Sequence, residues 1–341
     1  MTQLRVALLG AGAIAHSSHL PSWREVAGAT VTWIVDRDLR RAQDVAAEFG
    51  IDNATTDADE AYRDVDAVDI CLPPSAHVAA ATHALEHGLH VLLEKPLALN
   101  RFEGELIQRA RDQARTTVMI AENWVFSSAA QRTREILGSG ELGDIFLVRA
   151  EHLTGLYIPD RHPDLPRWVS DPTGVDSGYL LNAGIHTISL CRNTVGEIDA
   201  VSVMMRSDAS LGAAFDVDLV AGIEFSRGAM GSLTFSGRSR HAVERRLGIE
   251  IFGTRGVVDF DVLTGRVTTT RDGVATTEEP TDPSMGFVEE IQHFVDAVRS
   301  GVEPITSVED QLRTMSVVDA MYRAARTNER VETRAHSEEK E

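Results

Sequence analysis

The chain has 341 residues, of which 43% are hydrophobic and 25% are charged. These ordinary globular values exclude collagen-like, low-complexity and wholly disordered proteins, and the length favours two domains. The 33 basic and 52 acidic residues give a formal net charge of −19 at pH 7, which repels phosphate backbones and anionic lipid, so we expect no nucleic acid and no membrane as partner.

The first third of the chain alternates short apolar runs with helical stretches. The predicted strands are 4–9, 30–35, 67–72, 90–93 and 118–121, and the predicted helices are 40–49, 76–87, 102–114 and a stretch that begins after a glycine turn and reaches toward residue 26. Strands without polar alternation are buried on both faces. The pattern therefore predicts an α/β domain with a parallel sheet covered by helices on each side.

From about residue 123 the pattern changes. After a helix at 127–137, strands predominate at 145–153, 198–206, 217–225, 231–236, 249–252 and 257–260, followed by helices at 287–299 and 308–326. Short turns containing glycine between these strands are typical of antiparallel neighbours. We therefore predict a dinucleotide-binding domain at 1–122, a second α/β domain at 123–330 and a flexible tail at 331–341.

The cysteine content indicates the compartment. Cys71 and Cys191 are far apart in apolar contexts, which excludes a disulfide framework and favours a reducing, cytoplasmic location. Arg5 and the apolar run after it resemble the start of a signal peptide, but Gly10 and Gly12 interrupt that run.

The turn after the first strand reads Gly10-Ala11-Gly12-Ala13-Ile14-Ala15. In this spacing the first glycine makes a tight strand-to-helix turn, and the second lets the backbone approach a pyrophosphate. The third position needs only a small residue, and the helix that follows offers N–H groups to the anion. We therefore predict that Gly10, Gly12, Ala13 and Ile14 contact a dinucleotide.

Asp36 stands at the end of the second predicted strand. A carboxylate there can accept both ribose hydroxyls and repels a 2′-phosphate, which favours NAD over NADP. Arg37 keeps NADP open, because a guanidinium can stack on adenine or hold a 2′-phosphate. The alternative is that Asp36 is only a turn residue.

Two further segments carry candidate chemistry. Glu94-Lys95-Pro96 follows the strand at 90–93, and ligands of an open parallel sheet lie beyond the carboxyl ends of its strands. The following proline keeps the backbone of Lys95 out of the helical region. The same tripeptide would also occur if Lys95 were an ordinary lysine in a surface turn. Further along, Asn182 and His186 are four residues apart, so on a helix they would share a face.

Together these motifs resemble the Gfo/Idh/MocA oxidoreductases over nearly the whole chain, to about residue 330. The residues that carry the resemblance are 10–15, Leu72-Pro73-Pro74 through His77, 88–96 with its Glu-Lys-Pro, and Asn182-x-Gly184-x-His186. It implies a Rossmann domain followed by an α/β domain with a large open, mostly antiparallel sheet. One face of that sheet commonly forms an oligomer interface, so we expect a homodimer or homotetramer.

The resemblance also assigns roles to residues. Pro73, Pro74, His77, Glu94 and Asn123 join the expected cofactor contacts, with Asn123 and Trp124 near the nicotinamide and the substrate. The family's usual catalytic set is a lysine in Glu-Lys-Pro with an aspartate and a histidine four residues apart. Lys95 and His186 match this set.

Two positions depart from that set. Asn182 stands in the aspartate position, and Ser189 where an acidic residue often follows. Asparagine here resembles a subset of the family that acts on nucleotide-linked or modified sugars. Asn182 cannot take a proton, but it can hydrogen-bond a substrate hydroxyl or orient His186.

The resemblance implies an NAD-dependent dehydrogenase that oxidises a secondary hydroxyl of a sugar, sugar derivative or cyclitol. His186 would be the base, since an imidazole suits proton transfer at neutral pH, and Lys95 would stabilise the alkoxide. Swapped roles stay open, because a desolvated lysine loses its proton more easily. A dinucleotide-binding regulator without catalysis and an NAD-dependent glycosidase are the alternative functions.

Substrate contacts are expected from the long irregular segment 157–179, where Tyr157, Arg167 and Trp168 could face a sugar, unless they are solvated loop residues. His83 and His87, four apart on a predicted helix, could chelate zinc. Metal sites need a third ligand, which the neighbouring sequence does not supply convincingly, so we expect no metal.

Overall fold

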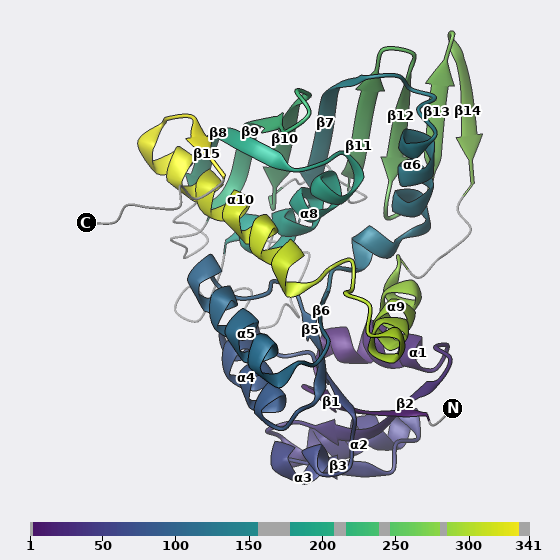
Figure 1. The fold of residues 1–341 in the computed structure, drawn as a ribbon, viewed down its shortest axis with the longest axis vertical. Coiled ribbons are helices and arrows are strands. Elements are labelled where there is room, and N and C mark those ends of the chain that lie inside the picture. The colour runs from purple at the N-terminus through teal and green to yellow at the C-terminus, as the bar shows by residue number, and fades with distance from the viewer. Residues whose placement is uncertain (1–2, 156–177, 208–215, 239–245, 280–284, 334–341) are drawn as a thin grey trace. The chain divides into compact units, whose positions relative to one another are not determined.

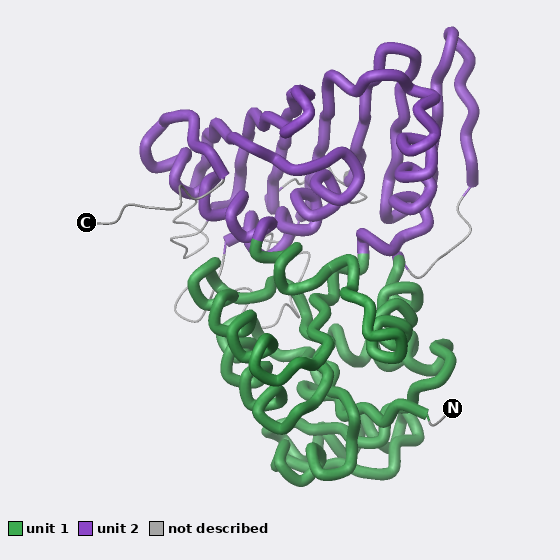
Figure 2. The backbone as a smooth tube through the Cα atoms, in the orientation of Figure 1, with its two compact units in different colours: residues 1–123, 286–312 green, residues 124–285, 313–341 purple. Residues whose placement is uncertain are grey.

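The computed structural model describes residues 3–155, 178–207, 216–238, 246–279 and 285–333. The chain forms two compact units, shown in green and purple in Figure 2. Unit 1 comprises Met1–Asn123 and Gly286–Leu312, and unit 2 comprises Trp124–Met285 and Arg313–Glu341.

Unit 1 is built on a six-stranded parallel sheet in the order β3-β2-β1-β4-β5-β6 (Figure 1). Its strands are β1 (Leu4–Leu9), β2 (Ala29–Val35), β3 (Asn53–Thr55), β4 (Ala67–Ile70), β5 (His90–Glu94) and β6 (Val118–Ala121). This is the order of a doubly wound Rossmann sheet, which confirms the predicted fold. The order reverses between β1 and β4, and ligands of such sheets bind beyond the carboxyl ends of the strands at that point.

The helices of unit 1 follow the predicted periodicity. They are a π turn η1 (Ala15–His19), α1 (Leu20–Trp23), α2 (Leu39–Phe49), α3 (Ala58–Tyr62), a 3-10 turn η2 (Pro74–Ala76), α4 (His77–Glu86), α5 (Arg101–Ala114) and α9 (Phe287–Ser300). Asp38 caps α2 by accepting from Arg40 N and Arg41 N, and Gly50 ends that helix at φ 68°. The short elements β3 and α3 were not predicted from the sequence, because they span too few residues to show a hydrophobic period.

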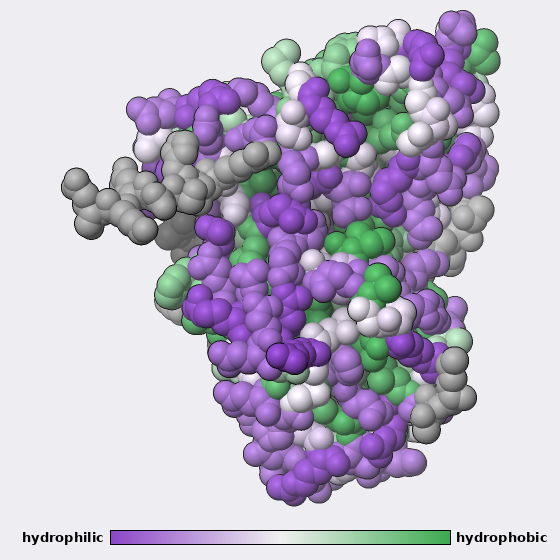
Figure 3. Space-filling view, viewed as in Figure 1, coloured by the Kyte–Doolittle hydropathy of each residue, from purple (hydrophilic) through white to green (hydrophobic). Residues whose placement is uncertain are grey.

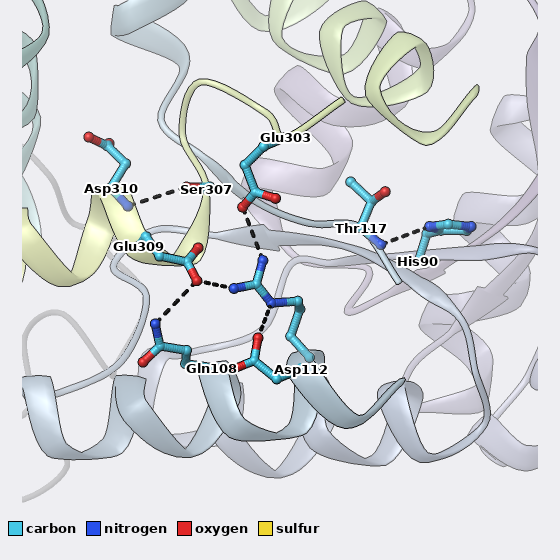
Figure 4. Close-up of polar contacts among 9 residues, drawn as sticks. His90, Gln108, Asp112, Thr117, Glu303, Ser307, Glu309 and Asp310 are labelled. Atoms are coloured by element: carbon cyan, nitrogen blue, oxygen red, sulfur yellow. Dashed lines mark hydrogen bonds and ion pairs between the residues drawn. The ribbon is translucent and has the colours of Figure 1, made fainter. Parts of the chain in front are cut away.

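Residues Gly286–Leu312 return to unit 1 although they follow unit 2 in the chain. Thr306 Oγ1 donates to the Ile120 carbonyl at 2.7 Å, beside the outermost strand β6. Arg111 of α5 pairs with Glu303 at 3.0 Å and also with Glu309 (Figure 4). The sequence-based division placed this segment in the second domain, because contacts between residues nearly 200 positions apart leave no local signature.

Unit 2 contains a nine-stranded sheet in the order β14-β13-β12-β11-β7-β10-β9-β8-β15. Its strands are β7 (Ile145–Leu153), β8 (Ile198–Ser207), β9 (Asp216–Phe225), β10 (Met230–Ser236), β11 (Arg246–Gly253), β12 (Gly256–Asp261), β13 (Val267–Arg271), β14 (Val274–Glu278) and β15 (Val331–Glu332). Neighbours are antiparallel except for the parallel pair β7 and β10. The predicted mostly antiparallel sheet is confirmed.

The two faces of this sheet differ. Along β9, Ala221 and Ile223 are buried while the residues between them are exposed, which is the alternation of a sheet covered on one side. Figure 1 shows α6 (Ser128–Gly138), α8 (Ile185–Thr194) and α10 (Val308–Thr327) on one face. A 3-10 turn η3 (Asn123–Phe126) leads into α6, and a π turn η4 (Leu180–Gly184) leads into α8.

The predicted flexible tail begins too early. Val331 and Glu332 form β15, which pairs with β8, and Thr333 N donates to the Asp199 carbonyl at 2.9 Å. Val331 and Thr333 are also buried. Two residues are too few for a visible strand pattern, so the polar composition around them concealed the pairing.

The visible surface in Figure 3 is mainly hydrophilic, in keeping with the large net charge. Among the helices of the described residues, none combines the length and the apolar character needed to cross a bilayer.

Candidate functional site

The glycine turn occupies the point where the strand order reverses. Gly10 has φ 96°, and a Cβ there would lie 2.5 Å from the Cys71 carbonyl oxygen, so the fold itself requires this glycine. At Gly12, by contrast, a Cβ would meet nothing within 4 Å. Folding therefore does not explain the second glycine, whereas the open space beside it fits a group that approaches the backbone closely, as a pyrophosphate does.

The helical segment after this turn presents its N-terminal end at the same place. His16 N bonds to the Gly12 carbonyl at 3.0 Å, and Ala13 is exposed at the first turn. N–H groups in a first turn have no acceptor within their own helix, and the helix dipole is positive there. The residues present thus fit the predicted binding of a dinucleotide.

Asp36 holds this turn from the end of β2. Its Oδ2 accepts from Ala11 N at 2.9 Å, and its Oδ1 accepts from Asp38 N at 2.9 Å. A carboxylate has lone pairs left after two such bonds, so it can still accept from ribose hydroxyls. Arg37 is exposed beside it, and Arg41 Nη1 lies 3.9 Å from Asp36 Oδ2.

One predicted cofactor contact, His77, lies in the interior of unit 1. His77 is fully buried, with Nδ1 2.8 Å from the Pro96 carbonyl and Nε2 2.9 Å from the Leu72 carbonyl. Burial lowers the pKa of His77, so the ring stays neutral and donates to one of these carbonyls. His77 therefore lies between the turn that contains Pro73 and Pro74 and the residue after Lys95.

Glu94 of the Glu-Lys-Pro segment belongs to a buried ionic network. His19 Nε2 lies 3.0 Å from Glu94 Oε1, and His19 Nδ1 lies 2.9 Å from Asp69 Oδ2. Burial by itself would lower the pKa of His19, but the interactions with Asp69 and Cys71 together outweigh it and raise that pKa well above its usual value. His19 is thus an imidazolium that donates to both carboxylates, and Trp23 Nε1 donates to Asp69 at 2.7 Å.

Two more buried acids lie in this part of unit 1. Burial raises the pKa of Glu122, just after β6, to about 8, although Lys95 opposes the shift. Burial also raises the pKa of Glu290, on α9, well above its usual value. Both side chains are therefore largely protonated near neutral pH.

Sequence reasoning missed this network, although a signal was present. Asp69, Glu94 and Glu122 stand at the carboxyl ends of the neighbouring strands β4, β5 and β6. Acidic residues at equivalent ends of adjacent parallel strands are expected to gather. His19 and Glu290 offered no comparable signal, since they come from separate helices.

In unit 2, His186 lies on α8 with 8% of its surface exposed. Its ring stacks on Trp124, with centroids 4.4 Å apart and an interplanar angle of 23°. His152 of β7 contacts the same indole at 5.2 Å and Tyr179 at 5.5 Å. This aromatic cluster fixes the plane of the proposed base.

The start of the helix that carries Asn182 and His186 is also fixed. Asp216 Oδ2 accepts from Leu180 N at 2.6 Å, and Asp216 Oδ1 accepts from Tyr322 OH at 2.8 Å. Burial raises the pKa of Asp216, while the bond from Leu180 N opposes the rise. Asn182 lies half-buried in the π turn η4, a feature that occurs frequently at functional sites.

His152, Tyr179 and Asp216 escaped sequence reasoning. A lone histidine in a strand and an aspartate at a strand's first residue carry no pattern that links them to distant helices. Of the other predicted residues, Asn123 is buried and Ser189 is buried on α8. Tyr157, Arg167 and Trp168 lie outside the described residues.

Comparison with known proteins identifies the relatives of both parts of the chain. Residues 4–122 match the model of an oxidoreductase family with an NAD-binding Rossmann fold, and residues 130–259 match the GFO/IDH/MocA C-terminal domain. The chain is 25% identical to a D-apiose dehydrogenase of Rhizobium rhizogenes, covering 95% of this chain and 96% of that protein. It is 26% identical to an inositol 2-dehydrogenase of Rhizobium meliloti, covering 94% and 96%.

A solved structure is similar to this chain over nearly its whole length. GenD2 from gentamicin A biosynthesis, in complex with NAD, matches with a TM-score of 0.84 at 26% identity and covers 98% of this chain and 97% of its own. The match extends across both units of the chain.

Proposed function

The chain belongs to the GFO/IDH/MocA oxidoreductase family, and from that premise we propose that it is an NAD-dependent dehydrogenase of a sugar, sugar derivative or cyclitol. The observation that carries the proposal lies within unit 1. An open dinucleotide turn at Gly12 and Lys95, which follows β5, stand at the carboxyl ends of strands in one sheet. Relatives of nearly equal length are named as dehydrogenases of D-apiose and inositol.

The turn at Gly12 and the helix start at Ala13 and Ile14 would hold the pyrophosphate, and Asp36 would hold the adenosine ribose. Pro73 and Pro74, Glu94 and Asn123 are the further contacts we propose. When bound, NAD accepts the hydride. We propose NAD as the preferred form, because the Asp36 carboxylate repels a 2′-phosphate, while Arg37 is the group that would serve NADP.

Asp36→Asn tests this preference. The amide keeps an acceptor oxygen but loses the charge, so we expect NAD affinity to fall roughly 10- to 100-fold and the discrimination against NADP to relax. Dissociation constants for both cofactors measure the effect. Asp38→Asn, two residues on at the exposed cap of α2, is the matched control. An unchanged NAD preference in Asp36→Asn would show that another group reads the ribose.

For the chemical step we propose His186 as the base that accepts the proton of the substrate hydroxyl. We propose the Lys95 ammonium as the hydrogen-bond donor that stabilises the developing negative charge of the alkoxide. Asn182 hydrogen-bonds a substrate hydroxyl. The ring of His186 is held by Trp124, which fixes its plane without contributing a charge.

His19 is proposed as a positioning residue. It touches neither reacting atom, but its imidazolium holds the Glu94 carboxylate, and Glu94 directly precedes Lys95. The ionic network thus fixes the backbone from which Lys95 extends.

We also propose a homodimer or homotetramer that forms through the uncovered face of the unit 2 sheet. Met204 of β8, Val220 of β9 and Met230 of β10 are 72%, 45% and 63% exposed on neighbouring strands. Met204 pairs directly with Val220, while Met230 pairs with Glu224, so exposed apolar and polar side chains share that face. The particle mass in solution tests this assembly. We also propose a cytoplasmic location, which the free thiols of Cys71 and Cys191 favour.

A substrate panel tests the function. Cyclitols, free sugars, sugar acids and nucleotide sugars are each incubated with the purified protein and with NAD or NADP, and NADH or NADPH formation is followed by absorbance. Net reduced cofactor with one class supports the dehydrogenase and names its substrate. Release of a sugar without net NADH would indicate the glycosidase, and tight NAD binding without any turnover would indicate the regulator.

A further inference from the structure

The fold completes a histidine pair that the sequence left without a third ligand. His83 and His87 lie one turn apart at the C-terminal end of α4. Asp59, in the first turn of α3, faces both of them. The three side chains come from two helices of unit 1 and share no residue with the proposed dehydrogenase machinery.

The ligand atoms converge on one point. Asp59 Oδ1 lies 3.0 Å from His83 Nε2 and 3.7 Å from His87 Nε2, and the three ligand atoms lie within 4.8 Å of one another. The imidazole rings stand at 87° with centroids 4.8 Å apart. Such spacing suits three ligands of one ion, because metal–nitrogen and metal–oxygen bonds are about 2.0 to 2.2 Å long.

One polar atom at this point accepts no hydrogen bond. Within the described part of the chain, Asp59 Oδ1 is shielded from solvent without such a bond, although the side chain as a whole is 48% exposed and His83 Nε2 lies 3.0 Å away. His87 Nδ1 lies 2.9 Å from the His83 carbonyl, to which it must donate. In the neutral ring the lone pair is then on Nε2, the nitrogen near Asp59, and this backbone anchor is typical of metal-binding histidines.

Tyr62 forms a wall beside the cluster. Its ring lies 5.3 Å from the His83 ring and 5.2 Å from the His87 ring, and the side chain is almost fully buried. The ring therefore restricts the positions of the two imidazoles.

We propose that Asp59, His83 and His87 bind a divalent transition-metal ion, with Zn²⁺ as the best fit. Two imidazoles and one carboxylate favour Zn²⁺, Ni²⁺ or Cu²⁺ over Mg²⁺ and Ca²⁺, which prefer oxygen ligands throughout. The ion joins α3 to α4. Since α4 starts beyond β4 and ends before β5 begins, its histidine end lies at the sheet edge opposite the cofactor turn, so the ion stabilises unit 1 and takes no part in hydride transfer.

One other set of potential ligands exists among the described residues: His19, Asp69 and Cys71. It is a weaker candidate, because His19 is already a cation that donates to Asp69 and Glu94. Binding that persists without the proposed ligands would point to this second set of residues.

Zn²⁺ titration of the full chain, free of tags and stripped with chelator, tests the site by calorimetry. We expect one Zn²⁺ per chain, and each of Asp59→Asn, His83→Gln and His87→Gln should weaken binding by roughly tenfold or more. His16→Gln is the matched control, because it removes a single exposed imidazole that pairs with a carboxylate, Glu48, at 3.0 Å. This control should bind as the wild type does.

Thermal unfolding supplies a second readout. Zn²⁺ should raise the melting temperature of the wild type and of His16→Gln but not of His83→Gln, while NADH formation by His83→Gln stays at the wild-type level. Stoichiometric binding that persists in all three ligand variants would place the ion elsewhere and overturn the proposal. Absence of binding to the wild type would overturn it as well.

Discussion

Each unit holds a histidine with a proposed role in or beside a helix that begins with a π turn, and the described neighbours of the two rings differ. In unit 1, η1 carries His19, whose ring lies between the carboxylates of Asp69 and Glu94. In unit 2, η4 leads into α8, where His186 stacks on Trp124. An ionic network fixes a protonation state as well as a position, and stacking on an indole fixes the plane of a ring. The first arrangement suits a permanent cation, and the proposed role of the second ring is that of a base.

His186→Ala should have the largest effect. Removal of a general base costs roughly 10²- to 10⁴-fold in kcat, and the limb of the rate profile near neutral pH should disappear with it. Steady-state rates across pH measure both. If the limb persists in the variant, the base lies elsewhere, and stacking on Trp124 has only a packing role.

Lys95→Met should lower kcat by roughly 10²- to 10³-fold, the usual loss when one group that stabilises a developing oxyanion is removed. NAD affinity should stay within a few fold of the wild type, because methionine keeps the length of the side chain. Rate and cofactor titration are measured on the same preparation. Turnover like that of the wild type would refute the role of the lysine.

His19→Gln tests whether the ionic network serves the neighbouring lysine. Glutamine cannot carry the charge that bridges two carboxylates, so we expect kcat to fall by about tenfold with little change in NAD affinity. In the wild type, activity should also decline at alkaline pH as the imidazolium deprotonates, and this decline should vanish in the variant. His16→Gln, exposed in the same π turn, is the control. If the two variants show the same kcat and the same pH dependence, His19 has only a structural role.

The sequence predicted the strands and the glycine turn of unit 1, but not the side chains that surround the two histidines. Periodicity located β1, β2, β4, β5 and β6, and the motifs placed Gly10, Gly12 and Asp36 at the carboxyl edge of the parallel sheet. That inference worked because a glycine turn after a buried strand has few structural solutions. Partners from distant segments, such as Asp216 under Leu180 or Asp59 beside His83, were not predictable, because such pairs depend on how helices pack and leave no local pattern. The surroundings of His77 were not predictable for the same reason, since burial between two carbonyls is a tertiary property.

Glu122→Gln should leave the chemical step almost unchanged, and its effect should fall on stability and its dependence on pH. Burial raises the pKa of Glu122 to about 8 in the folded chain, against an ordinary value of 4.5. Between these values the unfolded chain releases a proton that the folded chain retains, so this group's contribution to stability is complete below about pH 4.5 and is lost as pH rises through about 8. The amide cannot titrate, and the unfolding free energy of the variant should therefore fall less steeply over this range, by up to about 1.4 kcal/mol per pH unit. Urea midpoints across the range measure the slope, with the exposed Glu25→Gln as control. Parallel slopes for wild type and variant would mean that Glu122 is ionised in the folded chain beside Lys95. The acids at the carboxyl edge of the unit 1 sheet would then all be charged, and no neutral acid would belong to the network.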